Sequence, residues 1–252
     1  MNNDHREHLV KVPAITLGFW VIKILATTLG ETGGDAVSMS MSLGYLVSTG
    51  IFMVLFVGAV IFQIKAPAFH PFVYWATIIA STTVGTTLAD FATRSIGIGY
   101  AGGSTLLFIL LLSSLLIWYR DLGRVDVSSV HTPKAESYYW LTIMFSQTLG
   151  TALGDWTADT AGLGYVGAAA IFSAMLLSVV LLHFYTKVSK AILFWSAFIL
   201  TRPLGAVVGD FLDKPLANGG LELSRYTATG VLLVLIAILI VVLPQRAAVK
   251  AH

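Results

Sequence analysis

The sequence WLTIMFSQTLGTALGD spans residues 140–155, and a related stretch of the same length occurs three more times. The other copies are WVIKILATTLGETGGD (20–35), WATIIASTTVGTTLAD (75–90) and WSAFILTRPLGAVVGD (195–210). Each copy begins with a tryptophan, has a glycine ten residues later and ends with an aspartate fifteen residues later. A small residue precedes each aspartate: Gly34, Ala89, Gly154 and Gly209. Repetition in four coincident registers predicts four copies of one structural unit.

Each copy lies in an apolar segment long enough to cross a bilayer. The chain of 252 residues is 56% hydrophobic and only 11% charged, which is too little charge for the surface of a soluble domain. Segments of roughly 20 apolar residues match the thickness of the hydrocarbon core. We predict an all-α, polytopic membrane protein with eight transmembrane helices at 14–36, 45–64, 72–94, 100–119, 138–159, 164–185, 191–212 and 226–244.

The eight predicted helices group into four two-helix repeats in a single membrane domain. The repeats span 14–64, 72–119, 138–185 and 191–244, and a basic linker at 120–137 separates the two halves. Because each repeat holds an even number of helices, all four enter the membrane in the same direction. We therefore expect parallel repeats around a pseudo-fourfold or nested twofold axis along the membrane normal. The four aspartates should form one layer, about 22 Å beyond the tryptophans at 1.5 Å per residue.

Basic residues predict the orientation in a bacterial inner (plasma) membrane. One set of loops and tails holds Arg6, Lys11, Lys65, Arg120, Arg124, Lys134, Lys187, Lys190, Arg246 and Lys250. The opposite loops and adjoining helix ends hold only Arg94, Lys214 and Arg225. The positive-inside rule then places both termini in the cytoplasm.

With these motifs in view, the chain resembles a family of uncharacterised bacterial membrane proteins. Its members consist of four tandem two-helix repeats of unknown function, each with a characteristic tryptophan, which here are Trp20, Trp75, Trp140 and Trp195. The resemblance covers residues 14–244. The fourth copy departs most, because it has Gly219-Gly220 where the others have Gly44-Tyr45, Gly99-Tyr100 and Gly164-Tyr165. The resemblance implies no activity.

The glycines and tryptophans have structural interpretations. Small residues four apart allow close helix packing in lipid, and here they are Gly30/Gly34, Gly85/Ala89, Gly150/Gly154 and Gly205/Gly209. The four tryptophans are interpreted as interfacial anchors, with ligand stacking as the alternative.

The aspartates Asp35, Asp90, Asp155 and Asp210 are the candidate functional residues. An ionisable group inside a membrane is costly and therefore indicates function, with helix capping as the alternative. Asp90 has Arg94 one turn on and Asp210 has Lys214, so these acids can be neutralised locally.

The first and third repeats differ from the other two in their neighbouring charges. Asp35 has Glu31 one turn away and Asp155 has Asp159, so repeats 1 and 3 should concentrate unneutralised acid that holds protons or a cation. Hard cations prefer oxygen ligands, and Thr28 and Thr151 add hydroxyls nearby. We therefore predict ion binding by these acids and threonines, with a metal such as Mn²⁺ at Glu31, Asp35, Asp155 and Asp159.

Two basic residues lie deeper in the predicted helices. Lys23 is expected either to pair with an acid or to snorkel to the cytoplasm, whereas Arg202 should pair with an acid. The bases of the motif region number four: Lys23, Arg94, Arg202 and Lys214. The acids number seven: Glu31, Asp35, Asp90, Asp155, Asp159, Asp210 and Asp213. Protons or a bound hard cation should fill the deficit.

The sequence argues against several functional classes, although an intramembrane enzyme stays open as an alternative. The chain has no cysteine, no histidine placed to hold a transmembrane haem, no nucleotide-binding loop and no nucleophile–base constellation. We predict no enzyme and no nucleic-acid partner, but a small secondary transporter that couples a cation to protons. A cation channel with a carboxylate ring and a membrane scaffold are the alternatives. The ion, the direction of transport and homo-oligomerisation stay open at this point.

Overall fold

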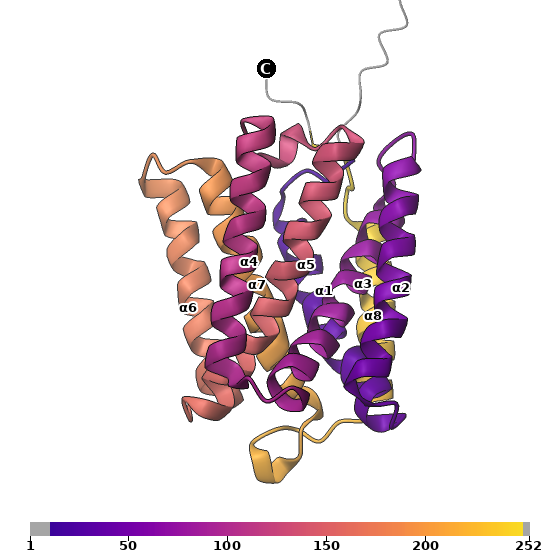
Figure 1. Ribbon diagram of the computed structural model, residues 1–252, viewed down its shortest axis with the longest axis vertical. Coiled ribbons are helices and arrows are strands. Elements are labelled where there is room, and N and C mark those ends of the chain that lie inside the picture. The colour runs from indigo at the N-terminus through magenta and orange to yellow at the C-terminus, as the bar shows by residue number, and fades with distance from the viewer. Residues whose placement is uncertain (1–10, 249–252) are drawn as a thin grey trace, which may run out of the picture.

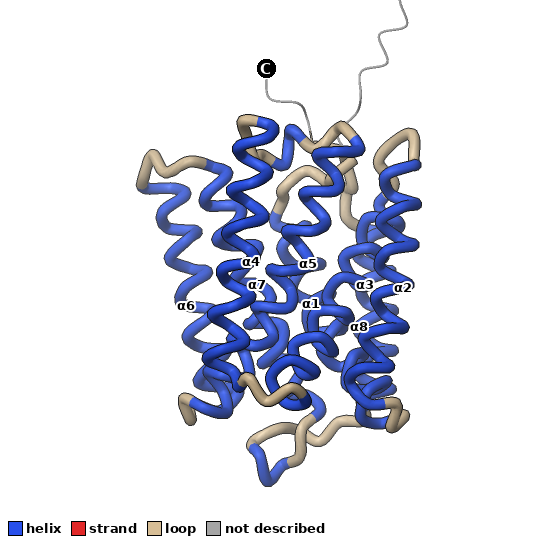
Figure 2. Tube along the Cα trace, in the orientation of Figure 1, coloured by secondary structure: helices blue, strands red, loops and turns tan. Residues whose placement is uncertain are grey.

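A computed structural model describes residues 11–248, and these form an all-α protein (Figures 1 and 2). Arg6 and Lys250, used above to predict orientation, and the histidines His5, His8 and His252 lie outside the described residues. The helices are α1 (Leu17–Asp35), α2 (Gly44–Lys65), α3 (Pro71–Asp90), α4 (Gly99–Leu122), α5 (Pro133–Asp155), α6 (Gly164–Tyr185), α7 (Lys190–Asp213) and α8 (Arg225–Val242). The predicted linker is shorter than 120–137, because α4 continues to Leu122 and a 3₁₀ turn, Val127–Ser129, follows.

The four motif helices form an inner ring. Helix α1 packs against α3 and α7, and α5 packs against the same two helices from the other side. Each remaining helix leans outward on the motif helix of the next repeat: α2 on α3, α4 on α5, α6 on α7 and α8 on α1. Neighbouring repeats are therefore interlocked, and no repeat buries its apolar surface alone.

Glycines create the close contacts between neighbouring ring helices. A side chain at Gly30 would overlap Thr82, one at Gly150 would overlap Arg202, and one at Gly205 would overlap Thr27. A Cβ atom at Gly85 would lie 2.9 Å from the backbone of Gln147. In every case the glycine receives the residue that follows the tryptophan of the next repeat by seven positions. The close approach therefore repeats at all four seams of the ring.

Short π-helical turns redirect the chain after the motif aspartates of three repeats. They span Ala36–Ser40, Phe91–Ser95 and Trp156–Thr160, and each precedes the Gly-Tyr pair that begins the next helix. The glycines of these pairs have positive φ angles of 72°, 67° and 62°, which explains why glycine recurs there. The fourth repeat has a longer connection, 214–224, which projects at the bottom of Figure 1.

The tryptophans lie inside the protein, so the prediction of interfacial anchoring is wrong for three of the four. Trp75, Trp140 and Trp195 are 0%, 2% and 5% exposed, whereas Trp20 is partly exposed. Two of the indole nitrogens bond within the protein: Trp195 Nε1 donates to the carbonyl of Val125 at 3.0 Å, and Trp75 Nε1 donates to Gln245 Oε1 at 3.2 Å.

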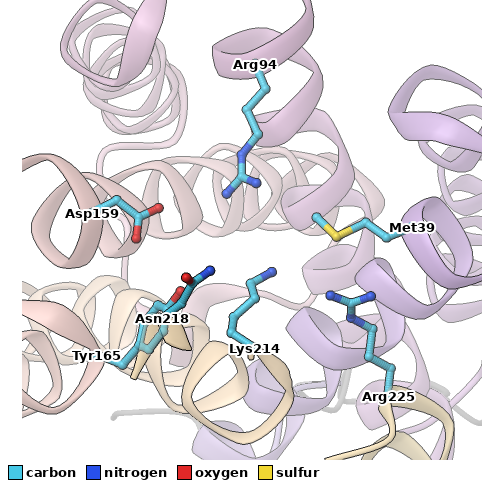
Figure 3. Close-up of a pocket in the computed structure, with 7 residues that line it drawn as sticks. All are labelled: Met39, Arg94, Asp159, Tyr165, Lys214, Asn218 and Arg225. Atoms are coloured by element: carbon cyan, nitrogen blue, oxygen red, sulfur yellow. The ribbon is translucent and has the colours of Figure 1, made fainter. Parts of the chain in front are cut away.

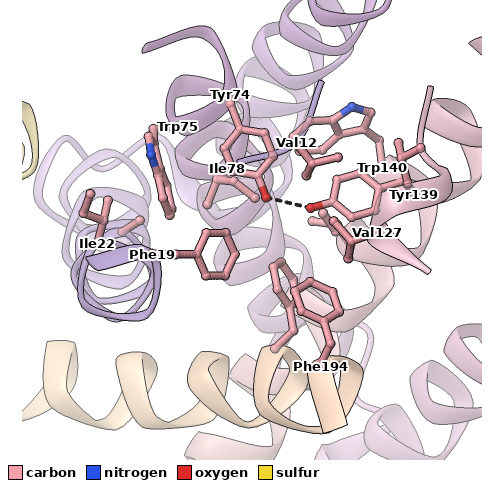
Figure 4. Close-up of a cluster of buried hydrophobic side chains, with 14 of the residues drawn as sticks. Val12, Phe19, Ile22, Tyr74, Trp75, Ile78, Val127, Tyr139, Trp140 and Phe194 are labelled. Carbon is pink, nitrogen blue, oxygen red and sulfur yellow. Dashed lines mark hydrogen bonds between the residues drawn. The ribbon is translucent and has the colours of Figure 1, made fainter. Parts of the chain in front are cut away.

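The residues that precede the tryptophans, Phe19, Tyr74, Tyr139 and Phe194, meet at the centre of the ring (Figure 4). The Tyr74 and Tyr139 hydroxyls share a hydrogen bond of 2.6 Å. We call this group the aromatic layer, and it closes one end of the ring.

The two described ends of the chain meet beyond the aromatic layer, at what we call the terminal face. Ala14 N donates to Arg246 O, and Ala248 N donates to Val12 O, both at 2.8 Å. The buried Lys11 ammonium lies 2.6 Å from Glu136 Oε1. This terminal clasp covers the aromatic layer. The opposite end of the ring, where the motif aspartates lie, is called the aspartate face.

Six helices, α2, α3, α4, α6, α7 and α8, are long and apolar enough to cross a membrane. Helices α1 and α5, each with three charged residues, do not meet that criterion. The outer helices expose most of their large apolar side chains, as expected of surfaces in contact with lipid. These features are those of a membrane protein.

Candidate functional site

Arg202 lies at the centre of the ring and contacts all the other motif helices. Its Nη2 atom, which carries two hydrogens, lies within hydrogen-bond distance of three acceptors: Glu31 of α1 at 3.0 Å, Thr86 of α3 at 2.6 Å and Thr151 of α5 at 2.5 Å. The side chain is completely buried and pairs with an acid, as predicted. Because burial removes the charge from water, the Glu31 carboxylate is required to keep the guanidinium favourable in this position.

Lys23 is placed differently from both predictions. Its side chain is completely buried, so it does not snorkel, and among the described residues no carboxylate lies within ion-pair distance of it. The ammonium group lies 4.2 Å above the ring of Phe198 and donates to Gln147 Oε1 at 3.4 Å. Lys23 therefore belongs to the region between the aromatic layer and Arg202.

The four motif aspartates are joined in two pairs by two bases. Arg94 lies 3.0 Å from Asp90 and 3.2 Å from Asp155, and we call this group the arginine bridge. Lys214 lies 3.0 Å from Asp210 and 2.5 Å from Asp35, and we call this group the lysine bridge. The base in each bridge belongs to an even-numbered repeat and reaches an aspartate of an odd-numbered one.

The bridges correct the prediction of unneutralised acid in repeats 1 and 3 for three of its four residues, and only Asp159 has no ion-pair partner in the described part of the chain. Asp35 and Asp155 each pair with a base from the neighbouring repeat, and Glu31 pairs with Arg202. Spacing along one helix reveals only the contacts within it, so it cannot show these partners. For the same reason Asp90 is not the sole partner of Arg94.

A further ion pair escaped the sequence interpretation. Arg225, at the start of α8, lies 3.1 Å from Asp213 and 3.9 Å from Asp35. The sequence places Arg225 beside a loop of the sparsely basic face. The one indication in the sequence is that this face holds few other bases, which makes each of them a candidate partner for the acids.

The charge balance of the site follows from these contacts. Each bridge holds two carboxylates and one base, whereas Glu31–Arg202 and Asp213–Arg225 are balanced pairs. With all groups ionised, each bridge therefore carries one excess negative charge. One oxygen of Asp35 and one of Asp155, Oδ1 in both cases, are buried and accept no hydrogen bond from the described residues. These oxygens remain available to a proton or a cation.

Three carboxylates, those of Glu31, Asp35 and Asp210, could hold a metal ion. Each offers one oxygen, and the three oxygens lie within 4.8 Å of one another. Asp155 and Asp159 do not join this group, so the predicted set of four metal ligands is corrected to two of its members plus Asp210.

Both predicted threonines take part in hydrogen bonds with other groups of the protein. The Thr28 hydroxyl donates to the Ile24 carbonyl of its own helix at 3.0 Å, and the Thr151 hydroxyl accepts from Arg202. Helix capping does not explain the aspartates, because Asp35, Asp90 and Asp155 make no capping bond to the turns that follow them.

A cavity of about 370 Å³ lies at the aspartate face. Its walls include the residues four positions after each motif aspartate, which differ in all four repeats: Met39, Arg94, Asp159 and Lys214 (Figure 3). Tyr165, Asn218 and Arg225 complete the lining. The buried bridges and the cavity therefore share Arg94 and Lys214.

A family model described as a Repeat of Unknown Function (DUF347) matches the chain four times, at residues 18–68, 73–121, 138–189 and 193–244. The matched segments follow the four repeats seen in the structure. No curated protein and no solved structure gives a significant match.

Proposed function

The chain belongs to this repeat family, and we propose from the geometry of its site that it is a small secondary transporter that couples movement of a cation to protons. All eight helices would span a bacterial inner membrane as four parallel repeats around a pseudo-fourfold axis, with both termini in the cytoplasm. The ring supports this topology, because the outer helices shield the polar helices α1 and α5 from lipid.

The observation that carries the proposal is the excess charge on the two bridges. A buried, uncompensated carboxylate is strongly disfavoured. Each bridge should therefore hold a proton, or a cation in its place. Since the two share the same oxygens, binding of a cation must release a proton, and acid must weaken cation binding.

The lysine bridge is the better place for the cation. It lies beside Glu31, so three carboxylates can surround one ion, whereas the arginine bridge has Thr86 and Thr151 at the positions equivalent to Glu31. Carboxylate oxygens suit hard cations such as Na⁺, Mg²⁺, Ca²⁺ or Mn²⁺. We assign the cation, or the proton that it displaces, to Glu31, Asp35 and Asp210. The proton of the other bridge is assigned to Asp90 and Asp155.

The two ends of the ring favour a transporter over a channel. The cavity reaches the bridges from the aspartate face, whereas the aromatic layer and the terminal clasp close the other end. A passage open at one end only suits alternating access, in which the site is exposed to each side in turn.

Calorimetry tests this proposal. Mn²⁺ binding to the purified protein, measured in buffers of different ionisation enthalpy, should release protons and become tighter as the pH rises from about 6 to 8. In proteoliposomes, a pH gradient alone should drive Mn²⁺, Ca²⁺ or Na⁺ against its own gradient. Asp35→Asn should abolish both effects, whereas Asp121→Asn, at an exposed acid on the terminal face, should change neither.

If none of these ions binds, the aspartates only hold the helices together, as in a scaffold. Movement of an ion down its gradient without proton release would instead identify a channel.

A further inference from the structure

The cavity at the aspartate face has opposite charges on different walls. Asp159 approaches from one side, whereas Arg94, Lys214 and Arg225 occupy the others, and the charged ends of Asp159, Arg94 and Lys214 point toward the middle (Figure 3). We propose that this cavity binds a small zwitterion that carries an ammonium and a carboxylate group, as an amino acid does. This inference goes beyond cation transport, because the binding requires no ion at the bridges.

The basic wall has donors to spare for a carboxylate. Arg94 uses Nε and Nη2 on Asp90 and Asp155, and Arg225 uses Nε and Nη1 on Asp213 and Ser40. Within residues 11–248, Arg225 Nη2 donates to no protein acceptor, whereas Arg94 also forms a side-chain hydrogen bond with Tyr45. Planar guanidinium groups fixed on one side by carboxylates are pre-organised to bind another carboxylate on the other.

The acidic wall has one unpaired carboxylate for an ammonium group. Asp159 is exposed and forms no ion pair with any base in the described part of the chain, although three bases line the same cavity. The Tyr165 hydroxyl and the Asn218 side chain lie on the same side of the cavity and supply neutral polar groups (Figure 3). Asp159 therefore faces open space that suits a cationic group of a ligand.

Neither a simple anion nor a simple cation satisfies both walls. The positive charges of the three bases are already shared with buried aspartates. A simple anion would therefore gain less from the bases and would be repelled by the unpaired carboxylate of Asp159. A simple cation would meet Arg94, Lys214 and Arg225 without supplying an acceptor for their free donors. A zwitterion satisfies both walls, and the cavity is near the lower end of the range of about 300–1,000 Å³ typical of small-ligand sites.

The three-way test uses L-alanine and its two halves. Isothermal titration of the full-length protein with the proteinogenic amino acids should show saturable binding of one or more of them. Propionate, which lacks the ammonium group, and ethylamine, which lacks the carboxylate, should bind at least about tenfold more weakly than L-alanine or the tightest amino acid. Asp159→Asn should weaken amino-acid binding by a similar factor, and Arg225→Gln should remove the preference over ethylamine. Asp121→Asn is the matched control and should bind as the wild type does.

Several outcomes would overturn the proposal. No binding of any amino acid would do so, as would ethylamine binding as tightly as the amino acid or propionate binding as tightly. Thermal melting of Asp159→Asn and Arg225→Gln separates lost binding from lost folding, and Asp159→Glu, which keeps the charge, should retain binding. Mn²⁺ binding with proton release, measured in the same samples, reports on the proposed transport function independently of this result.

Discussion

The arginine bridge and the lysine bridge occupy equivalent places in the two halves of the ring, yet their surroundings differ. Arg94 belongs to a π-helical turn, and its rigid fork holds Asp90 and Asp155. Lys214 lies just after α7, in extended backbone, and presents a single ammonium to Asp35 and Asp210. Only the lysine bridge has a third acid, Glu31, beside it. The same repeat position thus builds a clamp in one half and a cluster able to exchange cations in the other.

Removing Arg202 should have the largest effect, because its guanidinium is the counter-charge of the buried Glu31, which lies beside the lysine bridge. Arg202→Met leaves Glu31 buried without a counter-charge, and the free energy of unfolding should fall by about 3–5 kcal/mol. The double variant Arg202→Met/Glu31→Gln should recover much of this loss. Unfolding in detergent micelles measures both. A loss below about 1 kcal/mol would show that the pair contributes little.

The glycines at the two bridged seams should give intermediate effects. Gly205→Ala forces α7 from α1, and Gly85→Ala forces α3 from α5, so each should cost about 1–3 kcal/mol from overpacking. Gly230→Ala, which meets no atom within 4 Å, is the control and should be neutral or stabilising. The two variants should also differ in cation binding. Gly205→Ala should weaken the binding of the cation, and Gly85→Ala should not. Equal weakening by both would contradict the difference between the halves.

Neutralising one acid of each bridge should change stability least. Asp155→Asn leaves Arg94 paired with Asp90, and Asp35→Asn leaves Lys214 paired with Asp210, so each should cost about 1 kcal/mol or less. Their ligand binding should differ. Asp155→Asn should still bind Mn²⁺ but take up one proton fewer on acidification, whereas Asp35→Asn should lose Mn²⁺ binding. Proton uptake measured by potentiometric titration, together with calorimetry, distinguishes the two variants. Identical behaviour would make the bridges equivalent.

Much of the fold could be predicted from the recurrence of tryptophan, glycine and aspartate. The repeat fixes the helix positions, and the spacing of fifteen residues between Trp20 and Asp35 places each aspartate on the same stretch of its helix as the others. The local ion pairs Asp90–Arg94 and Asp210–Lys214 follow from helical geometry and are confirmed. These properties all lie within one repeat.

The remaining properties depend on the order of the helices around the ring. The approach of Lys214 to Asp35 joins residues 179 positions apart, and no spacing along the sequence reveals it. The burial of Trp75 also depends on how the helices are arranged around the ring. An indole is apolar enough for either the membrane interface or the protein interior, so the sequence alone does not distinguish the two positions. The sequence does contain one indication of the cavity. The residues four positions after each aspartate differ in all four repeats, although the positions around them are similar, and these four residues line the cavity.

The terminal clasp makes this linear chain effectively circular. The fourth repeat contacts the first as the other repeats contact one another, and the hydrogen bonds between residues 12–14 and 246–248 bring the two ends together. The point at which the chain begins is therefore arbitrary with respect to the fold. A circular permutant of residues 11–248 that begins in the connection before Pro133, with residues 248 and 11 joined by a short linker, keeps every helix neighbour and the same orientation of each helix. Two complete repeats simply exchange their order. The ring, not the order of its repeats along the gene, is the unit that the sequence encodes.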